Sequence, residues 1–282
     1  MTSTTWRRWS WPVLLAYACV AVLLAYALFP VLWMVSTALK PTPEIRTAEP
    51  TFVPSRPTFE HFGLVLGQSN FLTYVRNSLL VATTVTAATL VVSTLAGYAF
   101  SRFGRLPGIS LAGVAMVLGQ MVPGVLLVVP LYITMNNLGL LDSLWSLILT
   151  YTTFSVPLST LMLKGFFDQV PTEVEEAAQL DGCPPSQVVW RIVLPLAVPG
   201  LMTTALYAFV QSWNEFLFGY TFISQDDRRT LTPGLADFIG LWTVDWCALM
   251  AAASLAVLPV TLAYLYLQRY LISGIATGAT KG

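Results

Sequence analysis

One polar stretch, residues 171–196, interrupts a sequence that is otherwise strongly apolar. It reads PTEVEEAAQLDGCPPSQVVWRIVLPL. Ala177 and Ala178 have little side-chain bulk, which lets the backbone of another protein come close, and Glu176 beside them supplies one charge for an ion pair. These residue types suit a docking helix. The alternative that they leave open is a solvated amphipathic loop helix.

Local signals predict that this stretch folds as a helix, a sharp turn and a second helix. Thr172, followed three residues later by Glu175, has the pattern of a capping box. Gly182 suits the left-handed conformation just past a helix end. Pro185 can open a second helix at its first turn, which then leads back into the membrane.

A second group of polar residues, 211–215, lies inside an apolar run. An ionised carboxylate in the hydrocarbon core costs roughly 2.5–3.5 kcal/mol, so Glu215 is predicted to face protein or water. Gln211, Trp213 and Asn214 are its neighbours. Polar groups beside an aromatic ring suit sugar hydroxyls and a pyranose face, so these four residues form a candidate substrate pathway. The alternative is that Glu215 and Asn214 brace helix packing.

Gln120 is a weaker candidate for lining the pathway. A polar amide in an apolar span also suits a hydrogen bond between helices, and this role is the favoured one for Gln120.

The spacing within 171–196 carries a resemblance to a known family. Glu176-Ala177-Ala178, three residues to Gly182, nine to Ile192 and one to Leu194-Pro195 give EAA-x3-G-x9-I-x-LP. This pattern resembles the EAA loop of binding-protein-dependent ABC importer permeases without a departure. The stretches SWNEFLFGYTFIS (212–224), LTPGLADF (231–238) and QRYLISGIATGATKG (268–282) are similar to the second permease subunit of maltose-transporter-type sugar importers.

The resemblance implies a type I ABC importer permease fold in which 176–181 is the coupling helix. The implied ATPase-coupling residues are Glu176, Ala177, Ala178, Asp181 and Gly182. The implied partners are a second permease subunit in a heterodimer, an ATPase dimer and an extracytoplasmic sugar-binding protein. The sequence has no GxxxxGK[ST], so ATP and Mg²⁺ are expected on the partner ATPase, with no cofactor in this chain.

The elements that position these residues are predicted to be membrane-spanning helices. Hydrophobic residues make up 56% of the chain and charged residues only 10%, against about a quarter charged in soluble domains. A helical crossing needs about 20 apolar residues, and lipid offers no partner for unpaired backbone groups. The sequence therefore predicts an all-α polytopic membrane protein with six transmembrane helices, at 12–39, 77–100, 109–135, 143–166, 197–223 and 247–268.

The charges in two short loops predict the orientation. SRFGR (101–105) has two arginines and NNLGLLD (136–142) has none, which favours cytoplasmic termini by the positive-inside rule. The predicted location is a prokaryotic cytoplasmic (inner) membrane. The predicted organisation is an N-terminal tail (1–11), a permease domain (12–268) with the coupling loop at 167–196, and a C-terminal tail (269–282).

Other functional classes fit the sequence less well. A secondary transporter would need several intramembrane ionisable residues, and Glu215 is the single carboxylate found. A membrane enzyme would need a convergent catalytic set, and none is found. A polyol phosphate such as glycerol-3-phosphate would recruit Arg or Lys into a span interior, so a neutral mono-, di- or oligosaccharide is favoured. The formal net charge of zero gives no indication of a nucleic-acid partner.

No metal or disulfide framework is predicted. Cys19, Cys183 and Cys247 are isolated and lack any CxxC spacing. The proline-rich segment 40–76 is predicted to be an extended outer connection, and its His61 is predicted to be a solvated loop residue.

Overall fold

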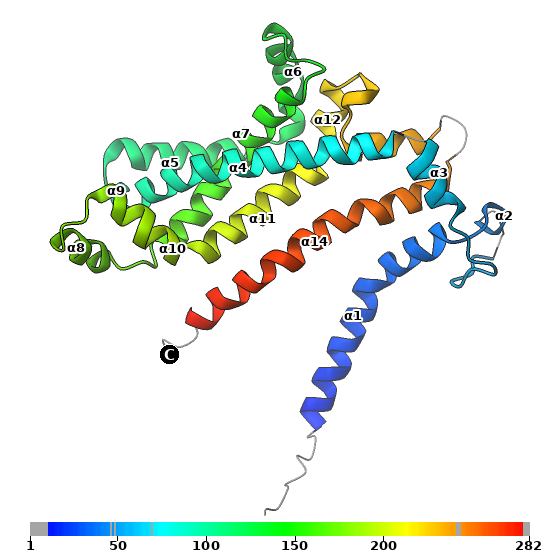
Figure 1. Ribbon diagram of the computed structural model, residues 1–282, viewed down its shortest axis with the longest axis horizontal. Coiled ribbons are helices and arrows are strands. Elements are labelled where there is room, and N and C mark those ends of the chain that lie inside the picture. Colours follow the sequence, from blue (N-terminus) through cyan, green and yellow to red (C-terminus); the bar gives the residue numbers. More distant parts are fainter. Residues whose placement is uncertain (1–10, 46, 48, 69, 241–243, 279–282) are drawn as a thin grey trace, which may run out of the picture. The chain divides into compact units, whose positions relative to one another are not determined.

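The computed structural model describes residues 11–45, 47, 49–68, 70–240 and 244–278, and these are helical for most of their length (Figure 1). They group into two compact units. Of the described residues, one unit holds those of 11–68 and 238–255, and the other holds those of 70–237 and 256–278. The predicted tails, 1–11 and 269–282, fall largely outside the described residues or on the end of one long helix, α14 (Trp246–Gly278).

The larger unit is built on three helices that lie side by side, α4, α7 and α11 (Figure 1). Its elements are α4 (Phe71–Phe103), α5 (Pro107–Gln120), η1 (Gly124–Leu127), α6 (Val128–Asn137), α7 (Leu144–Phe167), α8 (Thr172–Leu180), α9 (Pro185–Val188), the π-helical η2 (Val189–Val193), α10 (Leu194–Leu196), α11 (Val198–Asn214), α12 (Leu217–Phe222), η3 (Asp226–Arg228), α13 (Leu231–Leu235) and the start of η4 (Ala236–Phe238).

Small and hydroxyl-bearing residues let α4 and α7 approach closely. A Cβ atom on Gly97 would lie 3.1 Å from the Leu163 Cβ atom and from the Thr160 carbonyl oxygen. The Ser93 hydroxyl donates to the Val156 carbonyl at 3.2 Å. Because lipid tails are as apolar as the side chains, close packing and hydrogen bonds of this kind hold membrane helices together.

Four single helices are long and apolar enough to cross a membrane: α1 (Trp11–Ala38), α4, α7 and the Trp246–Arg269 part of α14. Two bent pairs bring the number to six if each pair is one span: Pro107–Gln120 with Gly124–Asn137, bent by 94°, and Pro185–Leu196 with Val198–Asn214, bent by 74°. These spans agree with the predicted class of all-α polytopic membrane protein.

Two of the predicted spans are broken in the structure. The stretch 109–135 is not one helix, because the chain leaves the helix at Met121 and Pro123 has extended backbone angles. The stretch 197–223 was predicted as one span, but α11 ends at Asn214 and Glu215 is extended, with φ −70° and ψ 128°. The second break places Glu215 just past the end of α11.

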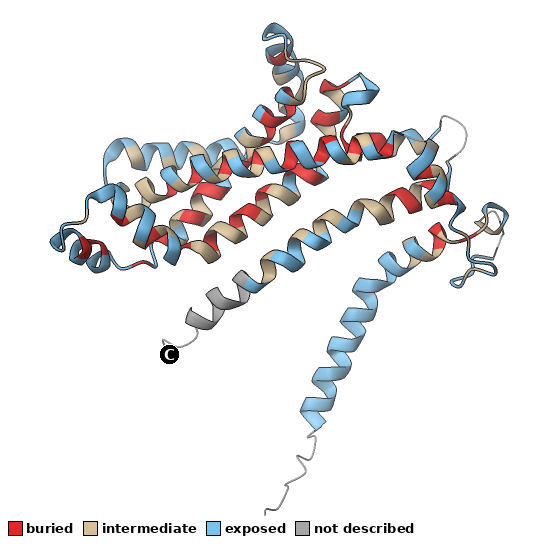
Figure 2. Cartoon of the chain, viewed as in Figure 1, coloured by how far each residue is buried: buried red, intermediate tan, exposed pale blue. Residues whose placement is uncertain are grey.

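The smaller unit contains α1, α2 (Thr42–Ile45), α3 (Glu60–Gln68) and the first residues of α14. The prediction of an extended connection over 40–76 is therefore wrong in part, because α2, α3 and the start of α4 lie within it. Helix α1 is exposed along most of its length (Figure 2), and its exposed side chains are apolar. This is the surface expected of a helix that lipid or another membrane chain covers.

Candidate functional site

The turn after α8 has the geometry that the sequence predicts. Gly182 has φ +88°, in the left-handed region. Its N–H donates to the Gln179 carbonyl at 3.0 Å, and the Cys183 N–H donates to the Ala178 carbonyl at 3.0 Å. This pair of hydrogen bonds closes the helix in a Schellman motif. Pro185 is the first residue of α9, which confirms its predicted place.

The predicted capping box between Thr172 and Glu175 is wrong. Helix α8 begins at Thr172 after Pro171 at the cap, and no side chain caps it. Glu175 is instead buried and points toward Arg102 of α4. The Arg102 Nη2 atom lies 2.5 Å from the Glu175 Oε1 atom. Pro171 at the cap has no N–H for this carboxylate to accept, whereas the Arg102 guanidinium offers an opposite charge and two N–H groups, so the ion pair determines where the carboxylate points.

Four of the five predicted coupling residues are exposed on α8 and its turn: Glu176, Ala177, Asp181 and Gly182. Ala178 is buried, and it packs in a cluster with Leu163, Phe167, Val188, Val193 and Ala197. Its small side chain therefore serves packing within this chain. Leu180, which sequence reasoning missed, is 89% exposed at the end of α8 and offers an apolar contact beside the acidic residues.

A hollow of about 350 Å³ lies among the break after α5, the helix α7 and the end of α11. Gln211 and Glu215 both line it, as the predicted substrate pathway requires. Gln120 lines it too, and its Nε2 atom donates to the Phe154 carbonyl on α7 at 3.0 Å, the interhelical bond that was predicted. The full lining is Gly119, Gln120, Val122, Pro123, Gly124, Tyr151, Phe154, Ser155, Tyr207, Gln211, Ser212, Glu215 and Phe218.

The other two predicted pathway residues do not line the hollow. Trp213 is 3% exposed, and its Nε1 atom donates to the Ala256 carbonyl of α14 at 3.2 Å. Two residues along an α-helix rotate by about 200°, so Trp213 and Gln211 point in nearly opposite directions. Asn214 is exposed at the last position of α11. The structure thus separates the four candidates into two pairs.

Glu215 also supports the fold around the hollow. Its carboxylate accepts hydrogen bonds from the Tyr151 hydroxyl at 2.5 Å, from the Phe218 N–H at 3.0 Å and from the Gly219 N–H at 3.1 Å. The two N–H groups belong to the first turn of α12, where a negative charge is favoured. These hydrogen bonds are the ones that the packing alternative for Glu215 requires, and Glu215 also lines the hollow.

Tyr207 is a lining residue that sequence reasoning missed. It lies four residues before Gln211, so the two share one face of α11, and Glu215 lies just past the end of that helix. The Gln211 Nε2 atom lies 3.4 Å from the Tyr207 hydroxyl. This spacing was the available signal, and it places two uncharged hydrogen-bonding groups side by side on one wall.

The segment after α12 is fastened to the start of α4 by polar contacts. The Tyr74 hydroxyl donates to Asp226 at 2.5 Å and to Asp237 at 2.9 Å, and Arg229 lies 2.7 Å from Asp237. Hydrogen bonds from Tyr74 and Asn70 and the charge of Arg229 hold the pKa of Asp226 below its ordinary value of 3.8, although partial burial opposes this.

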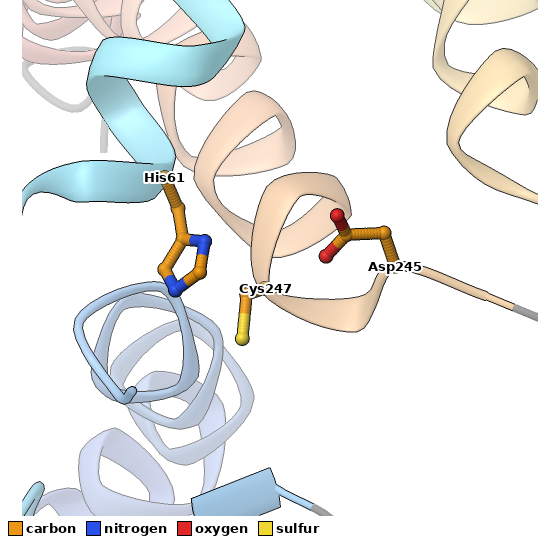
Figure 3. A group of neighbouring side chains, drawn as sticks. All are labelled: His61, Asp245 and Cys247. Carbon is orange, nitrogen blue, oxygen red and sulfur yellow. The ribbon is translucent and has the colours of Figure 1, made fainter. Parts of the chain in front are cut away.

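His61, Asp245 and Cys247 form a group whose possible ligand atoms lie within 4.8 Å of one another (Figure 3). The prediction that His61 is solvated is wrong, because it is 5% exposed and its Nε2 atom lies 3.1 Å from the Lys40 carbonyl oxygen. The Cys247 thiol lies 3.7 Å from the same oxygen, and Asp245 caps the N–H of Ala248. Each of the three side chains thus has a partner within the protein, and His61 and Cys247 fasten α3 and the start of α14 to the turn just after α1.

Comparison with known proteins identifies a family for most of the chain. Residues 90–277 match the family described as binding-protein-dependent transport system inner membrane component. The diacetylchitobiose uptake system permease protein of Streptomyces coelicolor is 37% identical over 272 residues, which cover 96% of this chain and 97% of that one. The trehalose transport system permease protein of Mycobacterium tuberculosis is 32% identical and covers 93% of this chain and 95% of its own.

A solved structure shows the same fold. It is a bacterial ABC transporter involved in the import of the acidic polysaccharide alginate, and one of its chains matches with a TM-score of 0.77 at 20% identity. The match covers 91% of this chain and 95% of that one. The predicted ABC importer permease fold is therefore confirmed.

Proposed function

Because the chain belongs to the family of inner membrane components of binding-protein-dependent transport systems, we propose that it is the permease subunit of an ATP-driven importer for a neutral carbohydrate. As a member of that family it is a multi-pass inner membrane transport protein and not an enzyme. We assign to it half of a translocation pathway, completed by a second permease subunit, with both termini in the cytoplasm.

The chemistry of the hollow carries the carbohydrate proposal. Its wall offers the uncharged groups of Gln120, Tyr207 and Gln211 together with the aromatic rings of Tyr151 and Phe154. Such groups suit sugar hydroxyls and an apolar sugar face. None of the described lining residues is basic, which disfavours a phosphate-bearing substrate. The similar permeases of uptake systems for diacetylchitobiose and trehalose support the same substrate class.

The exposed face of α8 and its turn supports the assignment of an ATPase contact. Glu176 and Asp181 give that face a negative charge, Leu180 gives it an apolar contact, and the left-handed Gly182 ends it abruptly. We assign this surface to a cleft in the cytoplasmic ATPase subunit, which would supply a basic partner for Glu176. The extracytoplasmic binding protein would deliver the sugar on the other side of the membrane.

Uptake of a panel of labelled sugars tests the substrate proposal. Gln211→Ala and Tyr207→Phe are each expected to weaken the apparent affinity for the transported sugar roughly twofold to tenfold, because each removes one hydrogen bond worth about 0.5–1.5 kcal/mol. Thr203→Ala, one turn before Tyr207 and outside the lining, is the matched control. Unchanged affinity in both lining variants would contradict the role of the hollow.

Association with the ATPase tests the coupling proposal. Glu176→Lys is expected to abolish uptake and co-purification of the ATPase while membrane insertion stays normal, because the side chain is exposed. Gln187→Lys adds a charge to an exposed position on the next helix and is the control. Gly182→Asp is a less specific test, because a side chain at φ +88° would strain the backbone of the turn as well as change its surface. Normal uptake by Glu176→Lys would refute the contact.

A further inference from the structure

A buried ion pair joins the end of α4 to the first turns of α8. Arg102 and Glu175 are 10% and 7% exposed at their side chains, and Nη2 lies 2.5 Å from Oε1. The Arg102 Nε atom donates to the same oxygen at 2.7 Å. The Tyr98 hydroxyl, one turn earlier on α4, donates to the other oxygen at 2.7 Å. Both oxygens of Glu175 are thus bonded to α4.

The same guanidinium also holds the end of α7. Arg102 Nη1 donates to the Phe167 carbonyl at 3.1 Å, and Nη2 donates to the Val170 carbonyl at 3.1 Å. These carbonyls belong to the last residue of α7 and to the link before α8. A cation at a helix C-terminus is favoured by the exposed carbonyl groups there. One side chain therefore joins three segments: α4, α7 and α8.

Apolar packing surrounds this ion pair on the inner side of α8. The Tyr98 ring meets the fully buried Phe167 ring edge-on, with centroids 5.8 Å apart. Ala178, three residues after Glu175 and on the same face of α8, packs in the cluster that contains Phe167. A charge pair in such surroundings is strongly held, because separating it would leave an uncompensated charge inside the protein.

We propose that the Arg102–Glu175 pair is the positioning element that makes the cytoplasmic ends of α4 and α7 move together with α8 when the ATPase moves it. This rests on the proposed contact between α8 and the ATPase. Glu176 and its exposed neighbours form the side of α8 that we assign to the ATPase, whereas Glu175, one residue earlier, bonds to Arg102 of α4. Adjacent glutamates thus carry the outer and the inner contact of the same helix.

The test measures sugar transported per ATP hydrolysed in proteoliposomes that contain the full complex with its binding protein. Glu175→Gln and Arg102→Gln are each expected to lower this ratio roughly twofold to thirtyfold, the range found for residues that couple distant sites, while the ATPase still co-purifies and hydrolyses ATP. The double variant is expected to be no worse than either single one, since the pair acts as a unit. Arg102→Lys, which keeps the charge but not the planar fork, is expected to restore the ratio in part.

The control is a second ion pair in the same region. Lys164 and Asp168 lie 2.6 Å apart but are 38% and 42% exposed, so Lys164→Gln is expected to leave the ratio unchanged. A purely structural role for Arg102–Glu175 would lower uptake and ATP hydrolysis in proportion, and an unchanged ratio would overturn the proposal. If the proposed contact between α8 and the ATPase is itself wrong, a different result is expected: the ATPase would still co-purify with the Glu176→Lys variant.

Tyr98→Phe provides a second test of the proposal if the Arg102 and Glu175 variants fail to assemble into the complex. It keeps the ring against Phe167 and removes only the hydroxyl that bonds Glu175. A lowered ratio in this variant supports the proposal, and an unchanged ratio overturns it.

Discussion

Replacing Glu215 by glutamine tests whether this carboxylate holds the first turn of α12. The carboxylate accepts from Tyr151, Phe218 and Gly219. Glutamine keeps the shape, but its NH₂ group must face one of the two backbone N–H donors whichever way the amide is turned. An unpaired donor costs about 1–3 kcal/mol, and loss of the charge beside a helix N-terminus adds about 0.3–1 kcal/mol. The expected local destabilisation is therefore about 1.3–4 kcal/mol.

Hydrogen exchange at the amides of Phe218 and Gly219 measures this local loss directly. A destabilisation of about 1.3–4 kcal/mol corresponds to exchange roughly tenfold to a thousandfold faster, at about 1.4 kcal/mol per factor of ten. The matched control is Gln211→Ala, another residue of α11 that lines the hollow, which is expected to leave exchange at these amides unchanged. Exchange that is unchanged in Glu215→Gln, with altered sugar affinity alone, would refute the packing role and make Glu215 a substrate ligand only.

Two further predictions concern the close packing of Gly200 and the loss of stability at low pH. A Cβ atom on Gly200 would lie 2.3 Å from the Phe166 Cγ atom, so Gly200→Ala is expected to cost about 1–3 kcal/mol and to lower the melting temperature, whereas Gly165→Ala, with no atom within 4 Å, is not. The lowered pKa of Asp226 means that its contribution to stability is complete above its ordinary value of 3.8 and is lost as the pH falls through the folded-state value. Proteolysis of 224–237 is therefore expected to be constant from about pH 8 to about pH 5 and to rise below about pH 4, with a smaller rise in Asp226→Asn; a rise near neutral pH would contradict this.

The turn after α8 was predictable because its causes are local. A left-handed position favours glycine wherever it occurs, and Gly182 occupies one. Pro185 begins a helix for an equally local reason, since its N–H would be unpaired there in any case. The capping box failed for the opposite reason. The residue that captures Glu175 is Arg102, 73 positions away in the sequence.

The candidate substrate residues show the same division between local features, which the sequence predicts, and contacts that depend on the fold. Sequence spacing places Tyr207 and Gln211 on one face of a helix, but it does not say what that face meets. In a soluble protein the polar face meets water and the apolar face meets the core. In a membrane, lipid and the protein interior are both apolar, so periodicity alone cannot tell the two apart. The structure was needed to show that Gln211 faces a hollow and that Trp213 faces α14.

The sequence by itself therefore determined the helical membrane class, the approximate spans and the coupling-loop pattern, because apolar length, glycine and proline act over a few residues. The tertiary structure decided which of two adjacent glutamates turns inward, where the third and fifth predicted spans break, and which polar side chains share a hollow. Those outcomes depend on partners that the fold brings together from distant parts of the chain, such as Arg102 for Glu175 and Tyr151 for Glu215.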